Sequence, residues 1–290
     1  MRILKPFEYF EPVTVSDAVG LLATYGDKSR ILAGGIDLIP RMRRREISAD
    51  YLISIQKIPG LDYIQEQENA GLKFGALARL YALENFKGIK KNYPGLHAAI
   101  HQISSIQTKH MGTAVGNLCV ATPASDVATA LLTLGAELTV SGVSRERKIP
   151  IGQFFLENNR TSLHGDEMVT GVNLPHPPNG MRTAFLNLFR THSDIAKVSV
   201  AVAVVFEDGL CKEARIAIGA AAPTVFRAVN AEKALAGRKL NSKMIDEAAK
   251  IAAEETRPIT DMRSTAEYRK SMSELLVRKA LEKTLESPKV

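Results

Sequence analysis

The sequence predicts an α+β protein built from two domains. The chain has 290 residues, about twice the length of an average domain. Short apolar runs alternate with helical periodicity in its first part, whereas strands precede helices in its last third. Residues 175–180, Pro-His-Pro-Pro-Asn-Gly, have the composition of a linker. We therefore expect one domain at residues 1–176 and a second, of the α+β class, at residues 181–290.

The first domain is expected to consist of two α/β lobes, at about residues 1–57 and 58–176, because Pro59 and Gly60 break the chain between them. In the first lobe, helical spacing begins after Thr14 or Ser16, either of which is a suitable cap. The elements expected here are a helix at 15–25, a strand at 30–33, a helix from about 37 and a strand at 51–55.

The second lobe is expected to contain strands at residues 72–76 and 137–141 and a helix at residues 96–106. A glycine-bearing loop at residues 112–117 follows that helix. Another helix is expected from Thr122, with Pro123 in its first position and Gly135 just past its end. Proline at the start and glycine at the stop are the favoured arrangement for a helix.

The C-terminal domain is expected to open with three strands, at residues 184–190, 197–206 and 211–218. Glu207-Asp208-Gly209 predicts a hairpin turn between the last two strands. Helices are expected from about Thr224 to Gly237, from Asn241, and from the capping box at residues 264–267 to about Leu285.

The charge balance does not indicate a nucleic-acid-binding protein. There are 38 basic and 31 acidic residues, a net charge of +7, and the densest basic run is residues 41–45. However, the chain has no tryptophan, aromatic residues make up 6%, and no nucleic-acid-reading module is present. A solvated helix face, or contact with an acidic partner subunit, accounts better for the basic run.

The cysteines and the apolar runs exclude further classes. Cys119 and Cys211 are the only cysteines, too few for a disulfide scaffold or for an iron–sulfur cluster, which needs about four thiolates. No apolar run reaches the roughly 18 residues of a membrane span, and Pro6 and Glu8 interrupt the region where a signal peptide is apolar. We expect a cytoplasmic protein that does not bind membranes.

No catalytic side chain and no metal site are predicted. The Gly-x-Ser-x-Gly nucleophile elbow of α/β-hydrolases is absent. His97 and His101 lie four residues apart on an expected helix, but no carboxylate stands between them. A surface or core-edge role therefore suits this pair better than a ligand role.

Two glycine-bearing loops carry the strongest chemical signal. The first spans residues 31–38 and the second residues 112–117, and each precedes an expected helix. Backbone N–H groups at a helix N-terminus stabilise phosphate, and glycine permits close approach of a ligand. Two such loops favour a diphosphate. Because Gly-x-Gly-x-x-Gly and the Walker pattern are both absent, a doubly wound dinucleotide domain is not expected.

Five segments resemble signatures of the FAD-binding subunits of molybdenum hydroxylases, a family that includes the medium chain of carbon monoxide dehydrogenase and the central domain of xanthine dehydrogenase. Leu-Ala-Gly-Gly-Ile-Asp-Leu at 32–38 resembles the first flavin loop. Residues 109–126 resemble the second loop and its helix. The C-terminal matches are residues 185–198, 218–224 and 261–269, so the resemblance covers nearly the whole chain in order.

The resemblance implies a two-lobed FAD-binding domain of the vanillyl-alcohol-oxidase and xanthine-dehydrogenase type, with FAD between the lobes, followed by an α+β domain. It also implies an electron-transfer role. A large partner subunit with a molybdopterin cofactor would oxidise the substrate, and a small partner with two [2Fe–2S] clusters would pass electrons to FAD and on to an external acceptor. A dimer of such heterotrimers is the expected assembly.

The same resemblance assigns cofactor contacts by position. Backbone groups of both loops would contact the diphosphate: Ile31, Leu32, Ala33, Gly34, Gly35, Ile36, Asp37 and Leu38 in the first, and Gly112, Thr113, Ala114, Val115, Gly116 and Asn117 in the second. Ser104 would lie near the flavin, Asp126 would hydrogen-bond FAD, and Val169 would offer backbone contacts. Arg160 and Lys197 are candidate cations for the cofactor, and Asn187 occupies a further cofactor position.

Three positions depart from the family pattern. Ile36 stands where threonine is common, Val115 replaces the first of two adjacent glycines, and Asn187 stands where lysine is usual. The Cβ of Val115 is expected to force the loop away from the ligand. Two alternatives stay open: a stand-alone FAD-dependent oxidoreductase, and a scaffold subunit of the same complex that has lost its flavin through these changes.

Overall fold

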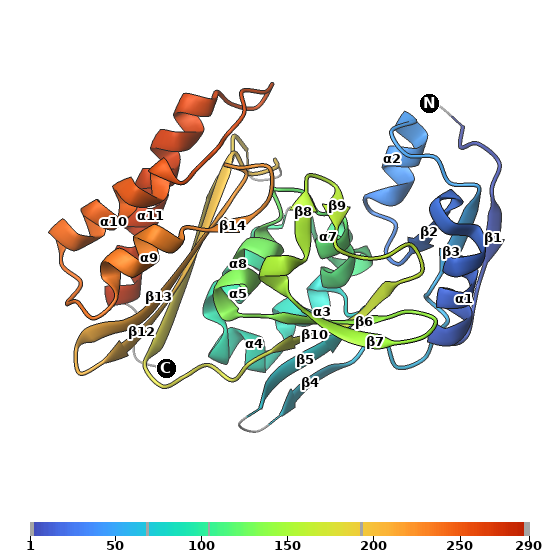
Figure 1. Ribbon diagram of the computed structural model, residues 1–290, viewed down its shortest axis with the longest axis horizontal. Coiled ribbons are helices and arrows are strands. Elements are labelled where there is room, and N and C mark those ends of the chain that lie inside the picture. Colours follow the sequence, from blue (N-terminus) through green and yellow to red (C-terminus); the bar gives the residue numbers. More distant parts are fainter. Residues whose placement is uncertain (1–2, 68–69, 104, 192–193, 287–290) are drawn as a thin grey trace.

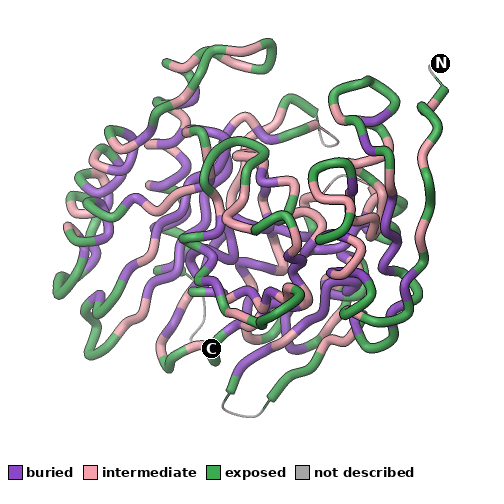
Figure 2. Tube along the Cα trace, turned by 45° about the vertical axis from the view of Figure 1, so that its right-hand side comes forward, coloured by how far each residue is buried: buried purple, intermediate pink, exposed green. Residues whose placement is uncertain are grey.

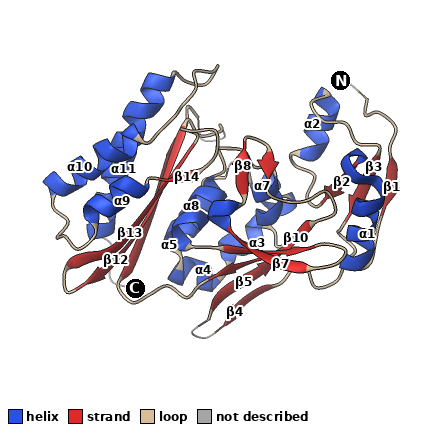
Figure 3. Ribbon diagram, viewed as in Figure 1, coloured by secondary structure: helices blue, strands red, loops and turns tan. Residues whose placement is uncertain are grey.

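The computed structural model describes residues 3–67, 70–103, 105–191 and 194–286. Three sheets follow one another along the longest axis of the molecule (Figures 1 and 3): a three-stranded sheet near the N-terminus, a five-stranded sheet in the middle, and a four-stranded sheet covered by the last helices. A two-stranded hairpin lies above the middle sheet. The predicted α+β class is confirmed.

The N-terminal sheet is parallel, with strand order β1-β3-β2. The cap of the first helix is Thr14, whose hydroxyl accepts a hydrogen bond from the Asp17 N–H, so the choice between Thr14 and Ser16 is settled by geometry. The elements are β1 (Glu8–Phe10), α1 (Val15–Tyr25), β2 (Ser29–Leu32), α2 (Leu38–Arg44) and β3 (Tyr51–Ser54).

The middle sheet is antiparallel, with strand order β4-β5-β10-β6-β7. Its apolar residues and those of the neighbouring helices form one large core. The strands are β4 (Ile64–Gln67), β5 (Gly71–Gly75), β6 (Glu137–Ser141), β7 (Glu146–Pro150) and β10 (Met168–Leu174), with β8 (Phe155–Glu157) and β9 (Arg160–Thr161) as the separate hairpin. The helices are α3 (Leu80–Asn85), α4 (Lys87–Asn92), α5 (Pro94–His101), α6 (Ile106–Met111), α7 (Ala114–Cys119) and α8 (Asp126–Leu134).

Two predictions for this part were wrong in their bounds. The single helix expected at 96–106 is two helices, because α5 ends at His101 and the Ser105 hydroxyl caps α6. The helix expected from Thr122 begins at Asp126, capped by Ser125. The carbonyl of Pro123 instead accepts a hydrogen bond from the Ala220 N–H at 2.6 Å, so a contact distant in sequence holds residues before Ser125 outside the helix.

The C-terminal part is a four-stranded antiparallel sheet, β11-β12-β13-β14, with three helices. The predicted turn is present, with positive φ at Asp208 and Gly209. The helix expected from Thr224 begins only at Val229, because Phe226 and Arg227 pair with β13. The elements are β11 (Met181–Leu188), β12 (Val198–Glu207), β13 (Leu210–Gly219), β14 (Phe226–Arg227), α9 (Val229–Leu235), α10 (Ser242–Glu254) and α11 (Ala266–Glu286).

This last sheet is packed on both faces. Helices α9 and α11 contact one face, and α5 and α8 of the middle part contact the other. As a result β12 is buried along its first seven residues, and Figure 2 shows the buried trace continuing from the middle of the molecule into this sheet. Among the described residues, no helix is both long and apolar enough to cross a membrane.

Arg269 of α11 connects three segments of the C-terminal part. Its guanidinium donates to the carbonyls of Lys197 and Ala220 at 2.7 and 2.8 Å and forms an ion pair with Asp261 at 2.8 Å. Arg269 is itself only 4% exposed. The bonds hold the chain before β12, the end of β13 and the loop before α11 in one place.

We expect Arg269→Met to lower the free energy of unfolding by about 3 kcal/mol, because two carbonyls and a carboxylate lose their buried partner. Urea denaturation of the full chain measures this. The neighbouring exposed Lys270 is the matched control, and Lys270→Met should change stability little. Equal effects of the two substitutions would contradict the assigned role of Arg269.

Candidate functional site

The two glycine loops touch each other. A Cβ built on Gly34 would lie 2.1 Å from the carbonyl oxygen of Met111 and 3.1 Å from the Cα of Gly112. No real side chain tolerates such distances, so the absence of a side chain at Gly34 is what allows this approach. The structure therefore brings together residues 31–38 and 112–117, which the sequence placed in separate lobes.

The first loop leads into the start of helix α2. Gly35 has a φ of +71°, which turns the chain from β2 toward α2 at little cost for glycine. Asp37 flanks the start of α2, but its side chain makes no capping hydrogen bond. Of the first three residues of α2, Ile39 donates its N–H to the Gly35 carbonyl at 3.2 Å and Pro40 has no N–H. The Leu38 N–H has no partner among the described residues and is the group at this helix start that suits an anionic ligand. Ile36 in the same loop is 42% exposed.

The second loop is more ordered than expected, because most of it is helix α7. The Thr113 hydroxyl caps this helix by accepting from the Gly116 N–H at 2.9 Å, and the Gly112 N–H donates to the Thr108 carbonyl. The prediction of a bare loop was wrong for these two N–H groups. The Val115 side chain is 4% exposed and belongs to the core, so its Cβ does not stand on the solvent side of the loop.

Asp126 is a buried carboxylate with an unfilled acceptor. One oxygen, Oδ2, accepts from the Asn187 amide at 3.1 Å, whereas Oδ1 is buried without a partner among the described residues. Burial raises the pKa of Asp126 to about 6, and the hydrogen bond from Asn187 acts in the opposite direction. A buried acceptor left open in this way is typical of a position that a ligand completes.

The remaining predicted contacts are more scattered. Arg160 in β9 is exposed and forms a 3.7 Å ion pair with Glu157, and the Lys197 ammonium lies 5.5 Å from the ring centroid of Tyr268. Within the described residues, neither side chain bonds to residues 31–38 or 112–117. Val169 is buried in β10, and Ser104 lies outside the described residues.

Two arginines that the sequence did not single out as site residues lie near these loops, Arg79 at the contact between them and Arg41 on the helix that follows the first. The Arg79 guanidinium donates to the Met111 carbonyl, the same atom on which Gly34 packs. Arg41 of α2 donates to the Asn159 side chain at 3.1 Å and so joins α2 to the β8–β9 hairpin. Only tertiary pairing reveals Arg79, because it lies 32 residues before Met111.

The two histidines of α5, His97 and His101, contact each other and a neighbouring carboxylate. Their rings stack at 6.1 Å between centroids, and His101 Nδ1 lies 2.7 Å from the Glu84 carboxylate. The same carboxylate forms an ion pair with the largely buried Lys109 at 2.8 Å. No group of three potential metal ligands occurs in the ranges that the structure describes.

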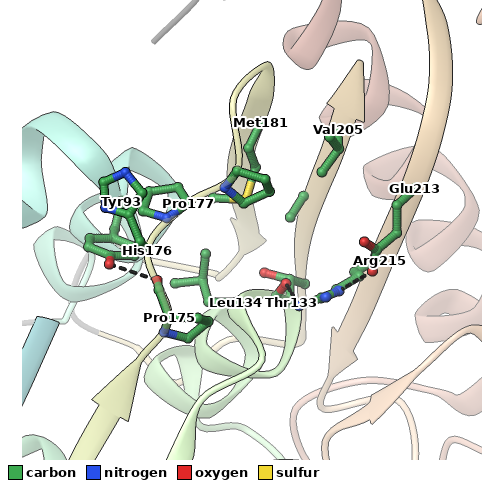
Figure 4. Close-up of a pocket in the computed structure, with 12 residues that line it drawn as sticks. Tyr93, Thr133, Leu134, Pro175, His176, Pro177, Met181, Val205, Glu213 and Arg215 are labelled. Carbon is green, nitrogen blue, oxygen red and sulfur yellow. Dashed lines mark hydrogen bonds and ion pairs between the residues drawn. The ribbon is translucent and has the colours of Figure 1, made fainter. Parts of the chain in front are cut away.

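A cavity of about 130 Å³ lies away from the glycine loops, between the linker, the end of α8 and strands β12 and β13 (Figure 4). Several of its polar groups are already paired. The Tyr93 hydroxyl donates to the Pro175 carbonyl at 2.9 Å, and Arg215 binds Glu213 at 2.6 Å. This cavity offers mainly apolar surface, which suits a diphosphate poorly.

The fold and the paired loops are those of an FAD-binding subunit, and comparison with known proteins confirms this class. Residues 5–177 match the family described as the FAD binding domain in molybdopterin dehydrogenase, and residues 183–284 match the CO dehydrogenase flavoprotein C-terminal domain. The chain belongs to this family of FAD-binding subunits.

Relatives match over almost their entire length. The chain is 33% identical to the 6-hydroxypseudooxynicotine dehydrogenase complex subunit alpha of Paenarthrobacter nicotinovorans, over 97% of this chain and 96% of that one. It is 31% identical to the carbon monoxide dehydrogenase medium chain of Afipia carboxidovorans, over 96% of each. A solved structure of reconstituted CO dehydrogenase from Oligotropha carboxidovorans superposes with a TM-score of 0.95, at 30% identity, covering 99% of this chain and 100% of that one.

Proposed function

We propose that this chain is the FAD-binding electron-transfer subunit of a multi-subunit molybdenum hydroxylase. Family membership supports the cofactor and the role. The observation that carries the proposal is the close contact of Gly34 with Met111 and Gly112, because it joins two loops that suit a diphosphate into one site.

The residues present fit FAD. The Leu38 N–H at the start of α2 and the glycine loops would hold the diphosphate, and the open Oδ1 of Asp126 would accept a hydrogen bond from the cofactor. Of the departures from the family pattern, Val115 is buried in the core and Asn187 donates to Asp126. When bound, the isoalloxazine of FAD supplies the redox chemistry, while the protein supplies position and excludes water.

The assembly and the boundaries belong to the same proposal. The partners are a large subunit with a molybdopterin cofactor and a small subunit with [2Fe–2S] clusters, arranged as a dimer of heterotrimers in the cytoplasm. We assign the FAD-binding domain to residues 1–176, with lobes at about 1–57 and 58–176, and the C-terminal domain to residues 181–290. Separate sheets in each of these three parts support the division.

Anaerobic mixing tests the role. The full chain loaded with FAD is mixed with its [2Fe–2S] partner subunit, previously reduced with dithionite and freed of excess reductant. We expect the visible flavin absorbance to decrease and to recover when an electron acceptor is added. A chain that takes up no FAD would support the scaffold alternative, whereas a lone chain that oxidises an organic substrate would support the stand-alone oxidoreductase.

A further inference from the structure

Arg79 brings a positive charge to the point where the two glycine loops touch. Its Nη1 donates to the carbonyl oxygen of Met111. The same oxygen lies 2.1 Å from the position that a Cβ of Gly34 would occupy. The guanidinium of Arg79 and the backbone of Gly34 therefore meet at one atom, which places the charge beside both loops.

The backbone around Arg79 holds it there. Arg79 and Thr113 form an antiparallel bridge. On either side of it, the Leu80 N–H donates to the Gly112 carbonyl at 3.0 Å and the Ala114 N–H donates to the Ala78 carbonyl at 3.3 Å. Residues 78–80 thus run alongside residues 112–114, and these backbone bonds fix the position of Arg79 relative to the second loop.

The charge of Arg79 is not compensated by the protein. Among the described residues, Arg79 forms no ion pair with a carboxylate, whereas Arg41 is paired with Asp37 and Lys109 with Glu84. A guanidinium carries five N–H donors, and within the part of the chain that the structure describes that of Arg79 donates to the Met111 carbonyl alone. An uncompensated cation at the contact between the two loops favours an anion.

We propose that Arg79 binds the diphosphate of FAD and at the same time anchors the second loop through Met111. This inference rests on the proposed function and adds a side-chain contact to the backbone contacts assigned above. The planar guanidinium is suited to it, because it offers two parallel N–H groups to one phosphate. Lysine at this position would keep the charge but not the paired geometry.

Equilibrium binding to the full chain tests the proposal, with FAD and riboflavin as probes. Riboflavin lacks the diphosphate, so it should not sense Arg79. We expect Arg79→Met to raise the Kd for FAD on the order of 10-fold, Arg79→Lys to raise it less, and neither to change the Kd for riboflavin. The Kd for FAD should also depend less on ionic strength in Arg79→Met. The control is Arg43→Met, which removes an exposed charge from α2 and should leave both Kd values unchanged.

The outcomes of this experiment distinguish a failure of the proposed function from a failure of the inference about Arg79. Wild-type chain that binds no FAD would overturn the proposed function and this inference together. FAD binding that is intact in Arg79→Met would overturn the inference alone. An equal loss of FAD and riboflavin affinity, with a lower melting temperature of the apoprotein and no rescue by lysine, would show that Arg79 only supports the fold.

Discussion

Replacing Gly34 with alanine should weaken FAD binding on the order of 100-fold, because overpacking of this kind costs up to about 3 kcal/mol. The new Cβ would lie 2.1 Å from the Met111 carbonyl oxygen, so the two loops would have to separate. A ligand that needs N–H groups from one loop and the charge of Arg79 from the other would then lose one set of contacts. Fluorescence titration of the apoprotein with FAD measures the change.

Gly20 provides the matched control for this substitution. It lies within α1, and a Cβ built on it meets nothing within 4 Å. Gly20→Ala should therefore leave FAD affinity unchanged and raise stability by up to about 1 kcal/mol, since alanine is the better helix former. Undiminished FAD affinity in Gly34→Ala would contradict the assignment of the cofactor to the contact between the loops.

Asp126→Asn should stabilise the apoprotein at pH 8 while it weakens FAD binding. The folded state raises the pKa of Asp126 to about 6 from the ordinary value of 3.8. The ionised form is thus disfavoured by folding, and its cost develops as the pH rises through 3.8 and is complete above about 6. The difference corresponds to at most about 3 kcal/mol, which asparagine would relieve.

The pH dependence separates this effect from a general change in stability. The gain from Asp126→Asn should be large at pH 8 and vanish below pH 3.8, where both side chains are neutral. FAD affinity should fall about 10-fold with the loss of a charged acceptor. Asp27→Asn, at an exposed carboxylate, should produce neither change. A stability gain independent of pH, or unaltered FAD affinity, would count against the role given to Asp126.

Local signals predicted much of the fold correctly. The strand at Glu137–Ser141 and the helix at Val15–Tyr25 have the predicted bounds, because alternation and helical spacing there agree with the caps and turns beside them. The helix start at Thr122 failed for a different reason. Thr122 and Ser125 are both good caps. The hydrogen bond from the Ala220 N–H to the Pro123 carbonyl decides between them, and Ala220 lies in the C-terminal part of the chain.

The candidate site was predictable only in part, for the same physical reason. Glycine spacing and the resemblance located both loops, and the structure shows that they meet. The contribution of Arg79 depends on its pairing with Thr113, which leaves no local pattern. Thr113 was expected within a bare loop, but its hydroxyl caps α7. A threonine before a short apolar segment suits a loop as well as a helix cap, so the sequence did not distinguish the two.

Crystallising the chain with FAD is the measurement that bears most directly on where the cofactor lies. We predict diphosphate density against Gly34 and the start of α2 on one side and Arg79 and Met111 on the other. Density in the cavity beside Tyr93 and Arg215, or a nucleotide bound elsewhere with the two loops still in contact, would contradict this placement of the cofactor.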